Sequence, residues 1–160
     1  MIRNGDLAPT FTLLDHDGAE HSSESFLGKP LVLLFFRGTF CPSSKKSICS
    51  WQDFSKSVRD LETGLLAISS DSAENHAEFA NQFGIKIPML SDTDLAVSKS
   101  YGVYLSHNRN AGEYGEPAIV IIDAKGKVAF SIISSGPKGM PEPGAIASML
   151  IFMYKRNGMY

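Results

Sequence analysis

Two cysteines, Cys41 and Cys49, lie in a segment of the sequence where a thiol can become reactive. The segment FRGTFCPSSKKSIC at 36–49 comes after an unbroken apolar run at 31–36 and contains Pro42. Such a run is typical of a buried strand, and proline is favoured at the first position of a helix. We therefore expect Cys41 at the N-terminus of a helix, where the dipole and free N–H groups favour the thiolate. A thiolate attacks a peroxide oxygen or a disulfide sulfur, so Cys41 is a candidate nucleophile.

Positive charge lies close to this cysteine in the sequence. Arg37 is the one arginine near the motif, and it could lower the pKa of the thiol or bind an oxyanion. The alternative for Arg37 is a salt-bridged surface position. Lys45 and Lys46 are expected on the solvated side of the helix. The alternative for Cys41 is an inert structural thiol, because free cysteines are often buried.

Ser44 and Cys49 complete the candidate catalytic set. A serine hydroxyl without a nearby base cannot perform peroxide chemistry, and its alternative role is local hydrogen bonding in the first helical turn. Cys49 follows Cys41 by eight residues, about 12 Å along a continuous helix. A disulfide needs Cα atoms within about 7 Å, so pairing requires the first turns to unwind. Cys49 is thus either a resolving thiol or a cysteine beside the apolar helix face.

The elements around this segment alternate between strands and helices, which predicts an α/β fold with a largely parallel core. A turn at 15–18 predicts an N-terminal hairpin. From Pro42 onward, apolar residues in steps of three and four predict one buried helix face; they are Ile48, Trp51, Phe54, Val58 and Leu61. Strands are expected over 11–14, 31–36, 65–69, 87–90, 118–122 and 128–133, and later helices over 71–83, 91–101 and 145–154.

The composition narrows the class of protein. With 160 residues, 43% hydrophobic residues and a net charge of −2, the chain fits a single globular domain over 1–160. The absence of a basic stripe argues against nucleic acid, and no apolar run is long enough for a membrane span. The start, MIRNGDLAPTF, lacks a signal-peptide core, so we expect a cytoplasmic protein. The four histidines are scattered, so neither a metal nor another cofactor is expected.

Six short motifs, in order along nearly the whole chain, resemble the peroxiredoxin group of the thioredoxin superfamily known as AhpC/TSA. The nearest branches are the bacterioferritin-comigratory or Q type and the peroxiredoxin-like proteins with an RGxxCPxC motif. The resemblance implies a thioredoxin-like fold, with a central mixed sheet flanked by helices and an added N-terminal hairpin. The matching motifs are GDLAPTF at 5–11, GKP at 28–30, ISSDS at 68–72, LSD at 90–92, YGV at 101–103 and IIDAKGK at 121–127.

The active-site motif departs from the family pattern, which is Thr-x-x-Cys with a peroxidatic cysteine. In this chain Cys41 falls on the threonine, Ser44 on the peroxidatic cysteine and Cys49 on the Q-type resolving position. The resemblance therefore implies a chain inactive or impaired at position 44, where serine replaces cysteine either by engineering, to trap a reduced or mixed-disulfide state, or by natural loss. In another interpretation, CPSS at 41–44 resembles a thioredoxin Cys-x-x-Cys whose second sulfur is replaced by oxygen.

Pro117 is a second departure. Typical peroxiredoxins have an arginine here that helps to bind peroxide, whereas thioredoxins and the RG proteins have a proline, usually cis, beside the active-site cysteine. The resemblance implies a cis peptide bond before Pro117. Arg37, Phe40 and Pro117 are the candidate substrate-binding residues.

Three functions remain open at this point. The first is reduction of hydroperoxides with position 44 as the peroxidatic site, Cys49 or Cys41 as the resolving thiol and a thioredoxin-like thiol donor that regenerates the protein. The second is disulfide oxidoreduction with Cys41 as the nucleophile and Pro117 guiding a peptide-like substrate. The third is a redox-inactive binding module. A monomer or a homodimer is compatible with each.

Overall fold

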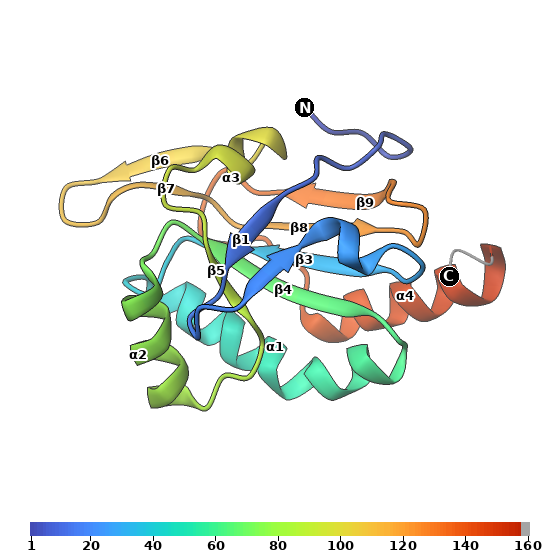
Figure 1. Ribbon diagram of the computed structural model, residues 1–160, viewed down its shortest axis with the longest axis horizontal. Helices are drawn as coiled ribbons and strands as arrows, with labels where there is room; N and C mark the ends of the chain where they lie inside the picture. Colours follow the sequence, from blue (N-terminus) through green and yellow to red (C-terminus); the bar gives the residue numbers. More distant parts are fainter. Residues whose placement is uncertain (158–160) are drawn as a thin grey trace.

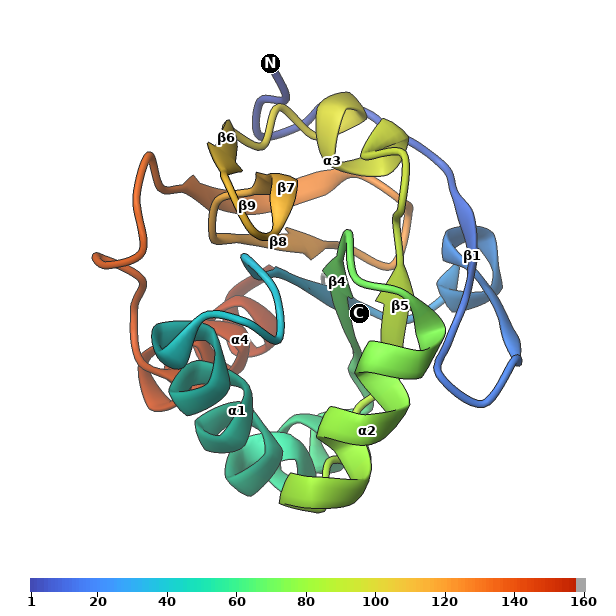
Figure 2. The same ribbon diagram turned by 90° about the vertical axis from the view of Figure 1, so that its left-hand side faces the viewer.

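The computed structural model describes residues 1–157, with side chains to residue 153, arranged around one central sheet (Figure 1). The helices at 42–60, 73–83 and 143–157 cover one face of this sheet, and the beginning of the chain together with a short helix at 96–100 covers the other (Figure 2). The strands are β1 (Thr12–Leu14), β2 (Glu20–Ser22), β3 (Leu31–Phe35), β4 (Gly64–Ser69), β5 (Met89–Ser91), β6 (Leu105–Asn108), β7 (Gly112–Gly115), β8 (Ala118–Ile122) and β9 (Val128–Ile133). The helices are the 3₁₀ turn η1 (Ser23–Phe26), α1 (Pro42–Asp60), α2 (Ala73–Phe83), α3 (Ala96–Ser100) and α4 (Pro143–Asn157).

The central sheet is mixed, with the strand order β5-β4-β3-β8-β9. Strand β3 runs parallel to β4, and β4 runs parallel to β5, whereas β8 is antiparallel to both β3 and β9. All five residues of β3 are buried, as its unbroken apolar run predicts. The expected α/β architecture, a mixed sheet flanked by helices, is confirmed.

Alternate residues of β3 enter two separate apolar cores, because successive side chains of a strand point to opposite faces. Val32 and Leu34 belong to the core that also contains side chains of α1, α2 and α4. Leu31 and Leu33 belong to the second core, which includes Tyr101 and the N-terminal segment. The sheet is therefore covered on both sides, and its polar chemistry is confined to its edges and ends.

Helix α1 packs on the sheet through the predicted apolar stripe. Ile48, Trp51 and Val58 are each no more than 2% exposed. Phe54 differs from the prediction, because it is 39% exposed at the margin of the stripe, where its ring lies beside Gly144 at the start of α4.

Of the two small hairpins, β1–β2 is predicted by the sequence and β6–β7 is not. The β1–β2 hairpin forms around the predicted turn. The β6–β7 hairpin projects from the body of the protein (Figure 1) and has no clear sequence signal, because its strands, LSHN and GEYG, contain no β-branched residue.

Helix α2 begins after Ser72 rather than Asp71, since the Ser72 hydroxyl accepts the Asn75 N–H at 3.2 Å.

Gly84 ends α2 in the left-handed conformation, at φ 66° and ψ 34°. A Cβ at this position would meet no other atom, so an alanine would be penalised only by the backbone. We predict that Gly84→Ala lowers the free energy of unfolding by about 1 kcal/mol, measured by urea denaturation.

Gly144→Ala is the matched control for this prediction. Its Cβ would lie 3.5 Å from the Phe54 ring, an ordinary contact, and its backbone is helical. This substitution should not lower the stability, and equal losses in the two variants would contradict the backbone argument.

Candidate active site

Cys41 lies at the predicted place, as the N-cap residue of α1 with Pro42 at the first helical position. Its backbone is extended, at φ −94° and ψ 120°, and its thiol makes no direct capping hydrogen bond. The residue is only 4% exposed, yet it belongs to neither apolar core. The sulfur is therefore buried among polar neighbours, and the interpretation as an inert core cysteine is not supported.

The surroundings of Cys41 favour its thiolate. The Arg37 Nη1 atom lies 3.7 Å from the sulfur. Burial raises the pKa of the Cys41 thiol, but the Ser44 backbone N–H, the Arg37 guanidinium and the Ser44 hydroxyl together outweigh burial and bring the pKa below its ordinary value. The start of the helix thus acts on this thiol as the sequence predicts.

Arg37 is itself held by residues that the sequence does not single out. Its Nε lies 3.1 Å from Glu116 Oε2, a contact too poorly aligned for a hydrogen bond and therefore an ion pair. Its Nη2 donates to the Tyr114 hydroxyl, and its Cζ lies 4.7 Å from the centre of that ring. Ser106 of β6 donates to Glu116 Oε1 at 2.7 Å. Arg37 is consequently a clamped, largely buried cation and not a surface residue.

Glu116 is the most important residue missing from the sequence prediction. Its side chain is 4% exposed, and a buried carboxylate is stable only with a partner. The available signal was a lone acidic residue between the polar segment of β7 and the apolar run of β8, but a sequence alone does not pair it with Arg37.

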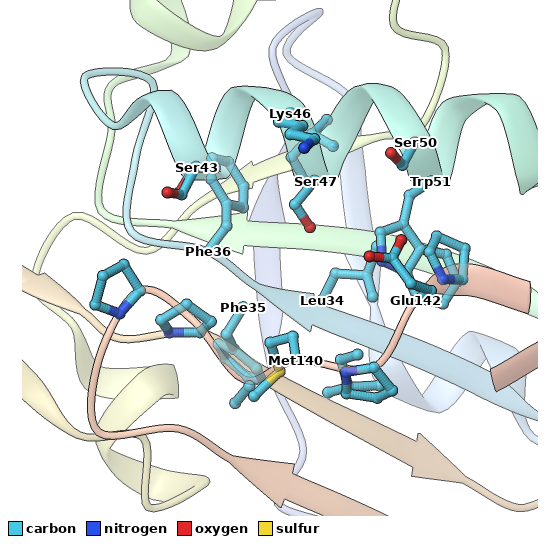
Figure 3. Close-up of a pocket in the computed structure, with 18 of the residues that line it drawn as sticks. Leu34, Phe35, Phe36, Ser43, Lys46, Ser47, Ser50, Trp51, Met140 and Glu142 are labelled. Carbon is cyan, nitrogen blue, oxygen red and sulfur yellow. The ribbon is translucent and has the colours of Figure 1, made fainter. Parts of the chain in front are cut away.

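Ser44 and Pro117 line one cavity of about 310 Å³, which Cys41 does not line. The Ser44 hydroxyl accepts the Arg37 backbone N–H at 3.2 Å. The cavity lies between α1 and the loop before α4, with Ser43, Ser47 and Ser50 on the helix side and Met140 and Glu142 on the loop side (Figure 3). Its polar groups are mainly hydroxyls, set on an apolar floor.

The implied cis bond before Pro117 is wrong, because the peptide bonds of the described residues are all trans. The antiparallel pairing of Ala118 with Phe35 continues the extended chain directly into β8. A trans proline fits this extended entry, and its ring faces the cavity shared with Ser44.

Cys49 and Cys41 are both free thiols. Cys49 is half-buried against the core beneath α1, and its pKa is raised by burial and by the neighbouring Asp53 carboxylate. Because α1 is continuous from Pro42 to Asp60, the two cysteines lie about 12 Å apart along the helix. They cannot pair in this conformation.

Phe40 is 40% exposed and packs edge-on against Tyr114, with ring centres 5.1 Å apart. Together with Arg37 it lines a second cavity of about 630 Å³. This cavity is bordered by polar side chains from the start of α2 and from the β6–β7 hairpin, namely Ser70, Asp71, Ser72, Asn75, Asn108 and Asn110. The candidate substrate residues are thus divided between two cavities, since Arg37 and Phe40 line this one and Pro117 lines the other, and Cys41 lines neither.

A chain of buried polar side chains lies behind the loop that carries Arg37. Asp71 accepts the Thr39 N–H and hydroxyl at 3.1 and 2.8 Å and the Ser69 hydroxyl at 2.6 Å. Ser69 also contacts His76 Nε2 at 2.7 Å, and His76 Nδ1 lies 3.3 Å from the Ser91 hydroxyl. His76 is completely buried, and burial lowers its pKa from 6.5 to about 4.

Two further features are absent from the described residues. No group of three or more His, Cys, Asp or Glu side chains there is arranged to hold a metal ion. None of the helices in residues 1–157 combines the length and apolar character needed to cross a membrane.

The mixed sheet, with a cysteine at the start of the helix after β3, defines a protein of the thioredoxin-like class. The sequence profile described as the AhpC/TSA family matches residues 4–131, and the chain belongs to this family. The resemblance in the sequence is thereby confirmed.

Individual relatives agree with this assignment. The chain is 30% identical over 130 residues to a putative peroxiredoxin bcp of Coxiella burnetii, covering 80% of this chain and 86% of that protein. It is 33% identical over 102 residues to chloroplastic peroxiredoxin Q of Triticum aestivum, covering 64% of this chain and 47% of that protein. The chain thus spans about half the length of the plant relatives that it matches.

Comparison with solved structures supports the fold. Peroxidoxin BcpB of Mycobacterium tuberculosis superposes with a TM-score of 0.81 at 23% identity, covering 98% of this chain and 99% of that chain. The expected thioredoxin-like fold is confirmed.

The contact between Arg37 and Cys41 leads to a prediction about ionisation. In a Cys49→Ser background, Arg37→Met should raise the pKa of Cys41 by about one unit or more, because the opposite charge is lost. The ultraviolet absorbance of the thiolate, followed during a pH titration, measures this directly. Lys45→Met removes a nearby cation that does not contact the sulfur and should leave the titration unchanged. An Arg37→Met protein with an unshifted midpoint would contradict the assigned contact.

Buried His76 leads to a prediction about stability. The unfolded chain binds a proton near pH 6.5, whereas folded His76 resists protonation to about pH 4. The unfolded state therefore takes up more protons in this window, and the protein should lose about 3 kcal/mol as the pH falls through it. Urea denaturation at several pH values should show this slope reduced in His76→Gln and retained in His107→Gln, whose histidine is exposed. Identical slopes in both variants would contradict the burial of a neutral imidazole.

Proposed function

We propose that this protein is a thiol-dependent peroxidase that reduces hydroperoxides, with Cys41 as its reactive sulfur. The observation that carries the proposal is the contact between the buried Cys41 thiol and the clamped Arg37 guanidinium at the start of α1. This arrangement lowers the pKa of the Cys41 thiol, which favours the thiolate, and places a cation beside it for the charge that develops on the leaving oxygen. Membership of the AhpC/TSA family supports the same chemistry.

The reaction proceeds in three balanced steps. The Cys41 thiolate attacks one peroxide oxygen, the O–O bond breaks, and the second oxygen leaves with a proton as water or an alcohol. The resulting sulfenic acid condenses with a donor thiol, which forms a mixed disulfide and releases water. A second donor thiol then attacks the mixed disulfide, so that the donor leaves as its disulfide and Cys41 returns to the thiol. A thioredoxin-like protein suits the role of donor, since family relatives are peroxiredoxins.

Ser44 occupies the position that corresponds to the family's peroxidatic cysteine, and we assign it no covalent role. Its hydroxyl accepts the Arg37 backbone N–H, and it helps to lower the pKa of Cys41. Because position 44 has no sulfur in this chain, we assign the role of nucleophile to Cys41, which lies about one helical turn before it. Cys49 would resolve the oxidised sulfur only after the first turns of α1 unwind.

Disulfide oxidoreduction remains the competing proposal, because Cys41-Pro42 stands at the position of a thioredoxin nucleophile. Pro117 gives it less support than the sequence implied, since this proline is trans and lines a cavity that excludes Cys41.

Peroxide consumption coupled to a thiol donor tests the proposal. Wild type and Cys49→Ser should form a sulfenic acid at Cys41, trapped by dimedone and located by mass spectrometry, whereas Cys41→Ser should show only the uncatalysed rate. Ser44→Cys is the informative addition: peroxide consumption by this variant and not by the wild type would assign the chemistry to position 44 and contradict the role of Cys41. Reduction of a small disulfide without peroxide consumption would favour the oxidoreductase, and inactivity in both assays would favour a binding module.

A further inference from the structure

Asp71 joins two loops that leave the same edge of the central sheet. Strands β3 and β4 are parallel, and Phe35 and Ile68 are paired near their carboxyl ends. The loop at 36–41 and the loop at 70–72 therefore start side by side. From the second loop, the Asp71 carboxylate receives both the backbone N–H and the hydroxyl of Thr39.

The loop at 36–41 is short, and its two ends are fixed by backbone bonds, from the Phe36 N–H to Ile68 and from the Arg37 N–H to the Ser44 hydroxyl. At its centre, the Asp71 carboxylate holds Thr39. Gly38 has φ 148°, and a Cβ built on it would lie 3.0 Å from Asp71 Oδ2 and 2.9 Å from the Phe40 ring. The backbone thus passes directly against the carboxylate. Because Thr39 lies between Arg37 and Cys41 in the chain, whatever fixes Thr39 also fixes the path that connects them.

A series of hydrogen bonds from the interior of the protein holds the Asp71 carboxylate in place, and each of these bonds has a defined donor and acceptor. The single Ser69 proton is donated to Asp71 at 2.6 Å, so Ser69 must accept from His76, which places the imidazole proton on Nε2. His76 Nδ1 then accepts from the Ser91 hydroxyl of β5. Each group thus donates to the next, from Ser91 in β5 to His76 in α2, and from His76 to Ser69 at the end of β4. The last donor, Ser69, bonds to the Asp71 carboxylate that holds Thr39.

We propose that Asp71 is a positioning residue for Cys41, holding Thr39 so that the Arg37 guanidinium stays in contact with the sulfur. The chain through Ser69 and His76 keeps the carboxylate in place. The catalytic consequence rests on the function proposed above, whereas the geometric role can be measured without any peroxide.

The direction in which the Cys41 pKa changes in an Asp71 variant distinguishes a positioning role from a purely electrostatic one. Removal of a negative charge near a thiol, with nothing else changed, stabilises its thiolate and lowers its pKa. Loss of the Arg37 contact acts in the opposite direction. An Asp71 variant with a raised Cys41 pKa therefore identifies positioning, since loss of charge alone cannot produce it.

The experiment titrates Cys41 by thiolate absorbance in a Cys49→Ser background. We expect Asp71→Ala to raise the Cys41 midpoint by about one pH unit. Thr39→Val, which keeps the side-chain shape and all charges but loses the hydroxyl, should raise it by a smaller amount. In both variants the pH profile of dimedone-trapped oxidation by hydrogen peroxide should shift with the midpoint.

Asp123→Ala is the matched control, because Asp123 also accepts two loop N–H groups, those of Lys125 and Lys127, at the opposite end of the sheet. It should leave the Cys41 midpoint unchanged, and circular dichroism verifies that each variant is folded. Unchanged or lowered midpoints in both Asp71→Ala and Thr39→Val would overturn the proposal. If Asp71→Ala fails to fold, an unchanged or lowered midpoint in Thr39→Val overturns it alone. A raised midpoint without peroxide oxidation in any variant would retain the positioning role and reject the peroxidase.

Discussion

A thiolate at the buried Cys41 sulfur and the largely buried Arg37 guanidinium would stabilise each other, and the rest of this site depends on this contact. Neither charge is stable alone in a dry environment, because burial without a partner is strongly unfavourable. Arg37 compensates Cys41, and Glu116 and Tyr114 in turn hold Arg37. The Cys41 sulfur thus lies at one end of a series of contacts that runs through the Arg37 guanidinium to the Glu116 carboxylate and the Tyr114 hydroxyl.

The topology of the sheet explains how these residues meet. The carboxyl ends of β3 and β4 and the beginning of β8 lie at one edge, since β8 is antiparallel to β3 and Ala118 is paired with Phe35. The segments that leave or enter there carry Cys41, Asp71 and Glu116. The opposite edge contains tight turns, such as the one capped by Asp123, and no comparable cluster of charges among the described residues.

The sequence predicts the parts of this protein that obey local rules. The buried strand, the proline at the start of α1, the glycine after α2 and the β1–β2 hairpin are encoded by neighbouring residues, and the position of Cys41 follows from the first two of these. The partners of Cys41 are not encoded locally, since Glu116 and Tyr114 are distant in sequence from Arg37. The prediction of a cis bond before Pro117 is wrong, because it came from the family resemblance alone. The chain enters β8 in an extended conformation, and a trans proline fits that path.

The peripheral β6–β7 hairpin affects when the site can exist during synthesis. Arg37 is separated from Tyr114 by 77 residues and from Glu116 by 79. A nascent chain that has emerged only through α2 already contains both cysteines, but it lacks the partners that hold the guanidinium. The contacts that clamp Arg37 can therefore form only after β7 and the start of β8 have been made, so this part of the site depends on late-synthesised segments.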